Sequence, residues 1–77
     1  MVGRRLHRSR APSEQEHRVI ELVAQGLTNR EIAKVIDATE FAVKNCLKAI
    51  YNKLGFWNRV ELALWYEARR HNRAKMN

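Results

Sequence analysis

Hydrogen-bond donors recur along one side of the segment from residue 40 to residue 54. The side chains on this side are spaced by three or four residues, as on one face of an α-helix, and they are Phe41, Lys44, Asn45, Lys48 and Asn52. A Lys ammonium can donate to guanine O6 and N7, and an Asn amide can pair with adenine N6 and N7, so these residue types predict recognition of base edges in the major groove of DNA. For Phe41 two interpretations stay open, contact with a thymine methyl group and packing beside the preceding turn.

The opposite side of the same segment is apolar. Val43, Leu47, Ile50 and Leu54 share one helical face, which predicts that this face packs against the core. A second helical pattern at residues 29–36 precedes it, and the connection of about three residues forces a sharp change of direction. Two helices in this arrangement, with the polar face of the second one exposed, predict a helix-turn-helix.

Helix starts are marked by capping boxes, in which a short polar side chain and a Glu three residues later bond to each other's backbone N–H. The pairs at this spacing are Ser13 with Glu16, Thr28 with Glu31, and Asn58 with Glu61. Thr39 is expected to cap a further helix without a return partner.

Helix ends are marked by residues that tolerate the left-handed conformation, namely Gly26, Asp37 and Gly55. Together with the starts, they predict helices at residues 13–25, 29–36, 40–54 and 58–71. No strand pattern competes with them. The expected fold is therefore all-α, with four helices in one helix-turn-helix domain.

The 77 residues fit one domain. We expect a basic arm at residues 1–11, the helical domain at 12–71 and a basic tail at 72–77. The net charge of +7 and the pI of about 10.3 indicate a polyanionic partner. However, the positive charge is concentrated near the two ends, and such tails bind any phosphate backbone by releasing counterions. Non-specific nucleic-acid binding by the tails, including binding to RNA, is therefore one alternative function.

Phosphate contacts are expected at both ends of the helix-turn-helix. N–H groups and the positive end of the helix dipole favour an anion at the start of residues 29–36, where the candidates are Thr28, Asn29 and Arg30. Simple capping is the alternative, and for Thr28 it is the preferred one. Asn52 and Lys53 are the candidates at the far end of the following helix.

The helix at 58–71 has more apolar surface than a single buried stripe needs. We expect a homodimer contact through this helix, with Val60, Leu64 and Trp65 as its main residues. The alternative is that Trp65 and its neighbours only complete the core.

Catalytic and cofactor sites have no support in the sequence. His7, His17 and His71 are scattered, Cys46 lacks a partner at metal-ligand spacing, and no phosphate-binding loop occurs. We expect no enzyme activity, no cofactor, no metal and no small-molecule ligand in this domain. No apolar run approaches the roughly 18 residues of a membrane span, and no signal peptide begins the chain. A cytoplasmic location without membrane contact is expected.

From about residue 12 to residue 71 the chain resembles the DNA-binding domain of the LuxR/NarL family of bacterial transcription regulators. The resemblance rests on Glu16 and on the motifs VIELVAQGLTNREIA, VKN, KLG and NRVELA, in the family's order and spacing. It implies a four-helix domain whose third helix enters the major groove and whose fourth packs against a second copy. Lys44, Asn45 and Lys48 fall where the family reads bases. The expected function is sequence-specific binding of double-stranded DNA by a transcription regulator.

Some residues depart from the family pattern. Ala42 stands where the family usually has Thr or Ser, so a hydroxyl contact to phosphate is not expected. Phe41 and Trp57 are larger than the usual residues. A protein-interaction module that has lost DNA recognition, with Trp57, Trp65 and Phe41 as anchors, is therefore a second alternative. Operator sequence, target genes, and activation or repression do not follow from the sequence.

Overall fold

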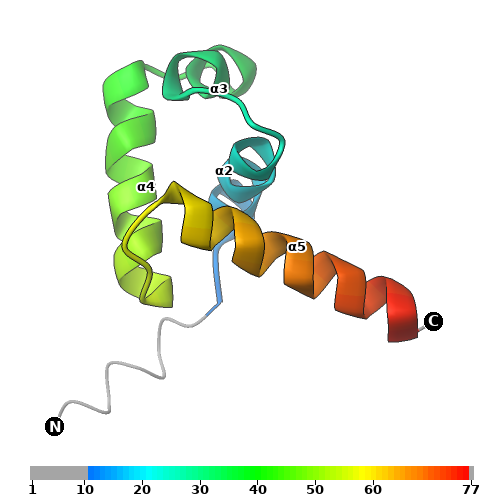
Figure 1. Ribbon diagram of the computed structural model, residues 1–77. Helices are drawn as coiled ribbons and strands as arrows, with labels where there is room; N and C mark the ends of the chain where they lie inside the picture. The colour runs from blue at the N-terminus through cyan, green and yellow to red at the C-terminus, as the bar shows by residue number, and fades with distance from the viewer. Residues whose placement is uncertain (1–10, 77) are drawn as a thin grey trace, which may run out of the picture.

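The computed structural model describes the backbone of residues 11–76 and the side chains of residues 11–71. In that part of the chain it contains four helices, which are α2 (Glu14–Ala24), α3 (Asn29–Ile36), α4 (Glu40–Leu54) and α5 (Arg59–Met76) (Figure 1). The helical segments expected from the sequence are all present, which confirms the all-α fold class. The basic arm expected at the N-terminus lies outside the described residues except for its last position.

Capping fixes the first three helix starts as predicted. Ser13 Oγ accepts from the N–H of Glu16 at 3.1 Å, and Glu16 Oε1 accepts from the N–H of Ser13 at 2.8 Å. The pair of Thr28 and Glu31 repeats this reciprocal bonding at 3.2 and 2.8 Å. Thr39 Oγ1 accepts from the backbone at 3.0 Å without a return bond. These bonds satisfy backbone N–H groups that have no partner inside the helix.

The start of α5 differs from the expected box in one bond. Asn58 Oδ1 accepts from the N–H of Glu61 at 3.0 Å, as predicted. The Glu61 carboxylate, however, accepts from the N–H of Trp57 at 2.6 Å, one residue before the expected donor. The Glu61 carboxylate therefore holds Trp57, the residue before the N-cap, and does not hold the N-cap residue Asn58.

The left-handed helix ends were also predicted correctly. Asp37 ends α3 with φ 58° and ψ 53°, and Gly55 ends α4 with φ 81°. A side chain with a β-carbon is strained in this region, and Asp is one of the few residues that adopt it at moderate cost. This reversal of the chain at Asp37 separates the two helices of the helix-turn-helix.

The expected end of the last helix at residue 71 was wrong, since α5 continues to Met76. The residues that follow His71 include Arg, Ala, Lys and Met, all good helix formers, and neither Gly nor Pro is present to stop the helix. Most of the segment expected to be a basic tail therefore has helical backbone. In Figure 1 this end of α5 extends beyond the other helices.

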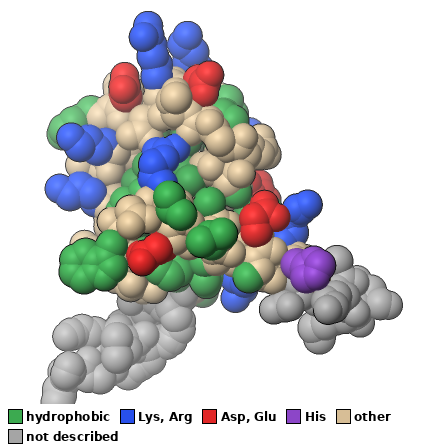
Figure 2. Space-filling model, viewed as in Figure 1, with side chains coloured by type: hydrophobic (Ala, Val, Ile, Leu, Met, Phe, Trp, Pro, Cys, Tyr) green, Lys and Arg blue, Asp and Glu red, His purple; other side chains and the backbone are tan. Residues whose placement is uncertain are grey.

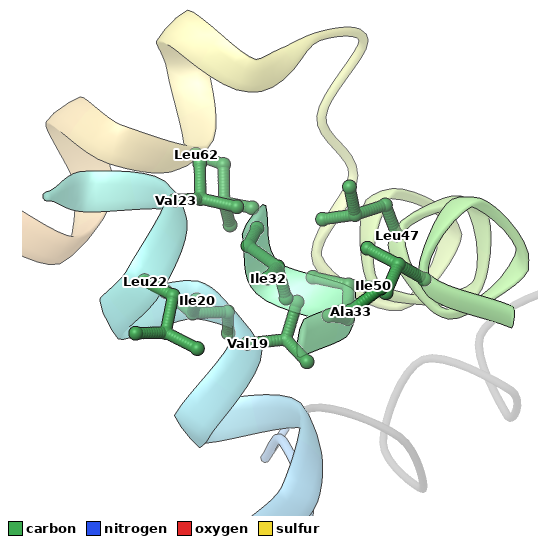
Figure 3. Packing of buried hydrophobic residues seen from close by; sticks show 10 residues of the cluster. Val19, Ile20, Leu22, Val23, Ile32, Ala33, Leu47, Ile50 and Leu62 are labelled. Atoms are coloured by element: carbon green, nitrogen blue, oxygen red, sulfur yellow. The ribbon is translucent and has the colours of Figure 1, made fainter. Parts of the chain in front are cut away.

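The core is formed by ten buried hydrophobic residues that come from all four helices. They are Val19, Ile20, Leu22, Val23, Ile32, Ala33, Val43, Leu47, Ile50 and Leu62 (Figure 3). Helix α2 contacts α3, α4 and α5, and α3 also packs against α4. Burial of the apolar face of α4 leaves its opposite face in solvent, which is the arrangement that the spacing of its residues predicts.

Candidate nucleic-acid interface

The face of α4 opposite the core is exposed along its whole length. Val43, Leu47 and Ile50 are 0%, 3% and 0% exposed, whereas all the predicted groove-facing residues are classed as exposed, including Phe41 at 72%. The structure thus places on one accessible surface Phe41, Lys44, Asn45, Lys48 and Asn52. We call this set the α4 outer face.

The base-reading candidates on the α4 outer face have free polar groups. Within residues 11–71, Lys44, Asn45 and Lys48 make no side-chain hydrogen bond or ion pair to the protein. Figure 2 shows Lys and Arg side chains projecting from the edge of the molecule that α4 forms in Figure 1. Because these donors are not used within the domain, they are available to a ligand. The side chain of Phe41 is 72% exposed, so little of its ring is covered by the protein.

The three candidate phosphate contacts at the start of α3 differ in their hydrogen bonds and in their exposure. The hydroxyl of Thr28 is used in the capping box, as preferred from the sequence. Asn29 is half-buried, and its Oδ1 accepts from Nη1 of Arg59 at 2.5 Å. Arg30 is exposed. Of the three side chains, only that of Arg30 is both charged and accessible.

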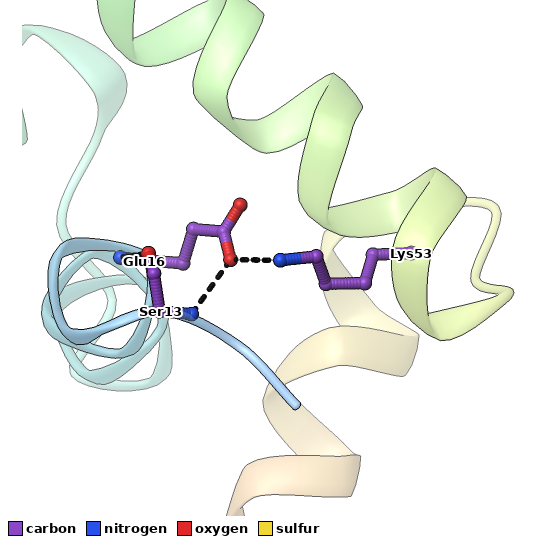
Figure 4. Close-up of polar contacts among 3 residues, drawn as sticks. All are labelled: Ser13, Glu16 and Lys53. Carbon is purple, nitrogen blue, oxygen red and sulfur yellow. Dashed lines mark hydrogen bonds and ion pairs between the residues drawn. The ribbon is translucent and has the colours of Figure 1, made fainter. Parts of the chain in front are cut away.

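Lys53 faces inward, unlike the other candidates on α4. Its Nζ lies 2.7 Å from Glu16 Oε1, and the two side chains are only 23% and 16% exposed (Figure 4). The same Oε1 accepts from the N–H of Ser13. Burial raises the pKa of Glu16, but the bonds from Lys53 and Ser13 outweigh it, so this pKa lies below its usual value. The ammonium of Lys53 is therefore paired within the protein.

Arg59 was not predicted from the sequence as a site residue. Besides its bond to Asn29, its Nη2 donates to the carbonyl oxygen of Leu27 at 2.6 Å. It thereby joins the first residue of α5 to the turn before α3. The residues are 30 and 32 positions apart, so no local pattern could have indicated this contact.

The candidate dimer residues on α5 divide into two groups. Val60 and Leu64 are 66% and 64% exposed, and Trp57, just before the helix, is 86% exposed. Trp65 instead packs against the core, with its ring edge-to-face on Phe56 at a centroid distance of 6.0 Å. Val60 and Leu64 on α5 and Trp57 just before it are therefore accessible, whereas most of Trp65 is not.

In the described part of the chain, no cluster of three or more His, Cys, Asp or Glu residues could hold a metal ion. None of the helices described there is long and apolar enough to cross a membrane.

Comparisons with known proteins agree with this geometry. Residues 13–66 match the family described as bacterial regulatory proteins, luxR family. The nitrate/nitrite response regulator protein NarL of Escherichia coli strain K12 is 39% identical over 56 residues, and so is its counterpart in Escherichia coli O6:H1 strain CFT073. Each alignment covers 73% of this chain and 26% of the relative.

The family match spans more than half of the chain and includes the capping boxes, the turn at Asp37 and the whole of α4. The family is non-enzymatic, and its helix-turn-helix domain binds DNA in transcription regulation. The chain belongs to the luxR family of bacterial regulatory proteins and forms a helix-turn-helix DNA-binding domain of that family.

Proposed function

We propose that the chain binds duplex DNA in a sequence-specific manner, with α4 in the major groove. Lys44, Asn45 and Lys48 face the base edges in this proposal, and Phe41 lies near enough for an apolar contact. The observation that carries the proposal is the set of donors on the α4 outer face, which make no hydrogen bond within residues 11–71 and lie opposite an apolar stripe. The 15 residues of α4 span about 22 Å at 1.5 Å per residue, and a helix of that size fits the groove.

Phosphate contacts flank the bases in this arrangement. Arg30 and Asn29 at the start of α3, and Asn52 near the end of α4, are the proposed contacts to the DNA backbone. Thr28 contributes through the backbone of the helix start that it caps. Lys53 takes a lesser part than the sequence indicates, because it would have to leave Glu16 to reach a phosphate.

We further propose that two copies bind adjacent half-sites, about 10 base pairs apart, through contacts between their α5 helices. Val60 and Leu64 support this because they are exposed on one side of α5 at the i, i+4 spacing. Trp57, just before α5, is also exposed, while Trp65 is partly buried against the core. The chain covers about a quarter of its relatives, and we propose that it serves as the DNA-reading part of a transcription regulator in the cytoplasm.

Selection from a library of randomised duplexes tests the sequence-specific function. We expect one enriched motif, and we expect the double substitution Lys44→Ala/Lys48→Ala to remove binding to it. A matched control is Arg18→Ala/Arg70→Ala, which removes the same charge from exposed positions on α2 and α5. This control should retain most of the affinity. A library that returns no enriched motif would contradict the proposal.

The first alternative function is non-specific binding of nucleic acid by the basic ends of the chain. A variant without their charge distinguishes it from sequence-specific binding. In this variant Gln replaces the basic residues outside the described side chains, namely Arg4, Arg5, Arg8, Arg10, Arg73 and Lys75. Motif-specific binding should survive these changes with a shallower salt dependence. Complete loss of binding would instead favour the non-specific function.

A protein-interaction module is the second rival. The observation in its favour is the exposure of two large aromatic side chains, Trp57 at 86% and Phe41 at 72%. Aromatic anchors of this kind are typical of protein interfaces. Trp57→Ala should leave the selected DNA motif unchanged if the chain reads bases through α4.

A further inference from the structure

We propose that Arg59 is a positioning residue for DNA binding, which acts by orienting the side-chain amide of Asn29 toward a phosphate. This inference rests on the proposed function. It starts from the guanidinium of Arg59, whose two outer nitrogens donate to Asn29 Oδ1 at 2.5 Å and to the carbonyl of Leu27 at 2.6 Å.

The chemistry of the guanidinium decides which way the Asn29 amide lies. Arginine has only donors, so the amide atom that faces it must be the acceptor Oδ1. The amide nitrogen of Asn29 then points away from Arg59. A free Asn side chain would exchange the two orientations, and its donor would face outward only part of the time.

The amide nitrogen that results is a donor in contact with solvent. Asn29 Nδ2 makes no hydrogen bond within residues 11–71, and no buried side-chain N or O in that range lacks a partner. Since Asn29 is half-buried rather than exposed, Nδ2 must therefore be accessible. Asn29 is the first residue of α3, so its side-chain amide adds a neutral donor at the end of the helix where the dipole favours an anion.

Arg59 holds Asn29 with one of its donors and the turn before α3 with another. Nη1 and Nη2 donate one bond each, and the side chain is half-buried between α5 and the turn at Leu27. In this proposal its effect on DNA binding passes through Asn29, and a direct contact from its other N–H groups is the alternative that the experiment below separates. This predicts that the two residues are energetically coupled in DNA affinity, which residues with independent roles are not.

A double-mutant cycle tests the coupling, with the 77-residue chain and a labelled mixed-sequence duplex of about 20 base pairs, long enough for two half-sites. We expect Asn29→Ala and Arg59→Ala each to weaken binding about fivefold, as loss of one hydrogen bond does. The double variant should be no weaker than the single ones. Where Arg59→Ala lowers the folded fraction, the same cycle is run with Arg59→Met, which keeps the apolar stem and removes the donors.

Two further readouts separate positioning from a structural role. Asn29→Asp keeps an acceptor for Arg59 and should not lower the thermal unfolding temperature, yet it should weaken duplex binding more than Asn29→Ala because it places a negative charge at the phosphate. In NMR titrations the Asn29 side-chain amide signals should shift on duplex addition in the wild type but not in Arg59→Ala. Backbone amides of Lys44 and Asn45 should shift in both.

The outcomes distinguish this inference from the proposed function. A wild-type chain that binds no duplex would contradict the proposed function. A wild type that binds, with losses from Asn29→Ala and Arg59→Ala that multiply, would overturn the positioning role alone. In that case a salt slope lower by about 0.9 for Arg59→Ala would assign the phosphate contact to Arg59 itself.

Discussion

Lys53 near the end of α4 is bonded to Glu16 in the first turn of α2, with Nζ and Oε1 2.7 Å apart across 37 residues of sequence. The same carboxylate oxygen accepts the backbone N–H of Ser13. One atom therefore fixes both where α2 begins and how α4 lies against it. The capping of α2 by Glu16 does not by itself indicate that the same carboxylate also bonds to α4.

Replacement of Lys53 by Met should destabilise the fold. It leaves the Glu16 carboxylate, which is only 16% exposed, without its charged partner. We expect a loss of about 1–2 kcal/mol in the free energy of unfolding, less than for a fully buried pair. Urea denaturation measures it. Lys48→Met is the matched control, since Lys48 is exposed, and it should change stability by less than about 0.5 kcal/mol.

The stability of the domain should fall with acid in a way that depends on Glu16. Its pKa is lowered in the folded state, so its contribution is complete above the ordinary glutamate pKa of about 4.3. The contribution is lost as pH falls through the lower, folded value, because the unfolded chain then binds the proton more readily.

Urea midpoints measured from pH 7 to pH 3 should show this effect. The wild type should lose more stability across that range than Glu16→Gln. Glu14→Gln, an exposed neighbour in the same turn, should follow the wild type. Parallel curves for the wild type and Glu16→Gln would contradict the role given to this carboxylate.

Asp37→Gly should stabilise the domain. Asp37 holds a positive φ of 58° at the end of α3, where glycine avoids the strain of a β-carbon and where a negative charge opposes the helix dipole. We expect a gain of about 0.5–1 kcal/mol by thermal unfolding. Asp37→Asn separates charge from strain, and Asp37→Val should destabilise. A loss of stability in the glycine variant would show that the Asp side chain has a further partner.

Val60→Glu/Leu64→Glu should prevent dimer formation and leave the fold intact, because both side chains are more than half exposed. Sedimentation equilibrium with and without duplex measures the association. Trp65→Ala is the contrasting variant, since Trp65 packs on Phe56. It should cost about 2 kcal/mol of stability, below the range for fully buried aromatics. A wild type that stays monomeric on DNA would exclude the α5 contact.

Local chemistry explains which features the sequence predicted. The box of Thr28 and Glu31 and the left-handed Asp37 are set by residues within a few positions of each other, so the bounds of α3 and α4 could be predicted. The outer face of α4 followed from helical periodicity alone. The end of α5 could not be placed, because neither Gly nor Pro follows His71.

Contacts between distant residues explain what was missed. Lys53 has the type and spacing of a phosphate contact, and only the packing of α4 on α2 turns it toward Glu16. The bonds of Arg59 to Asn29 and Leu27 depend in the same way on where α5 crosses the turn before α3. Trp65 was expected at a dimer contact, with completion of the core as the alternative, and its ring packs on Phe56.

The core receives its last side chain late in the chain. Leu62 is fully buried and comes from α5, where Figure 3 shows it beside Val23 of α2. Until residue 62 has been synthesised, part of the apolar side of the helix-turn-helix therefore remains exposed to water. The core of the helix-turn-helix is therefore completed only after the first turn of α5 has been synthesised.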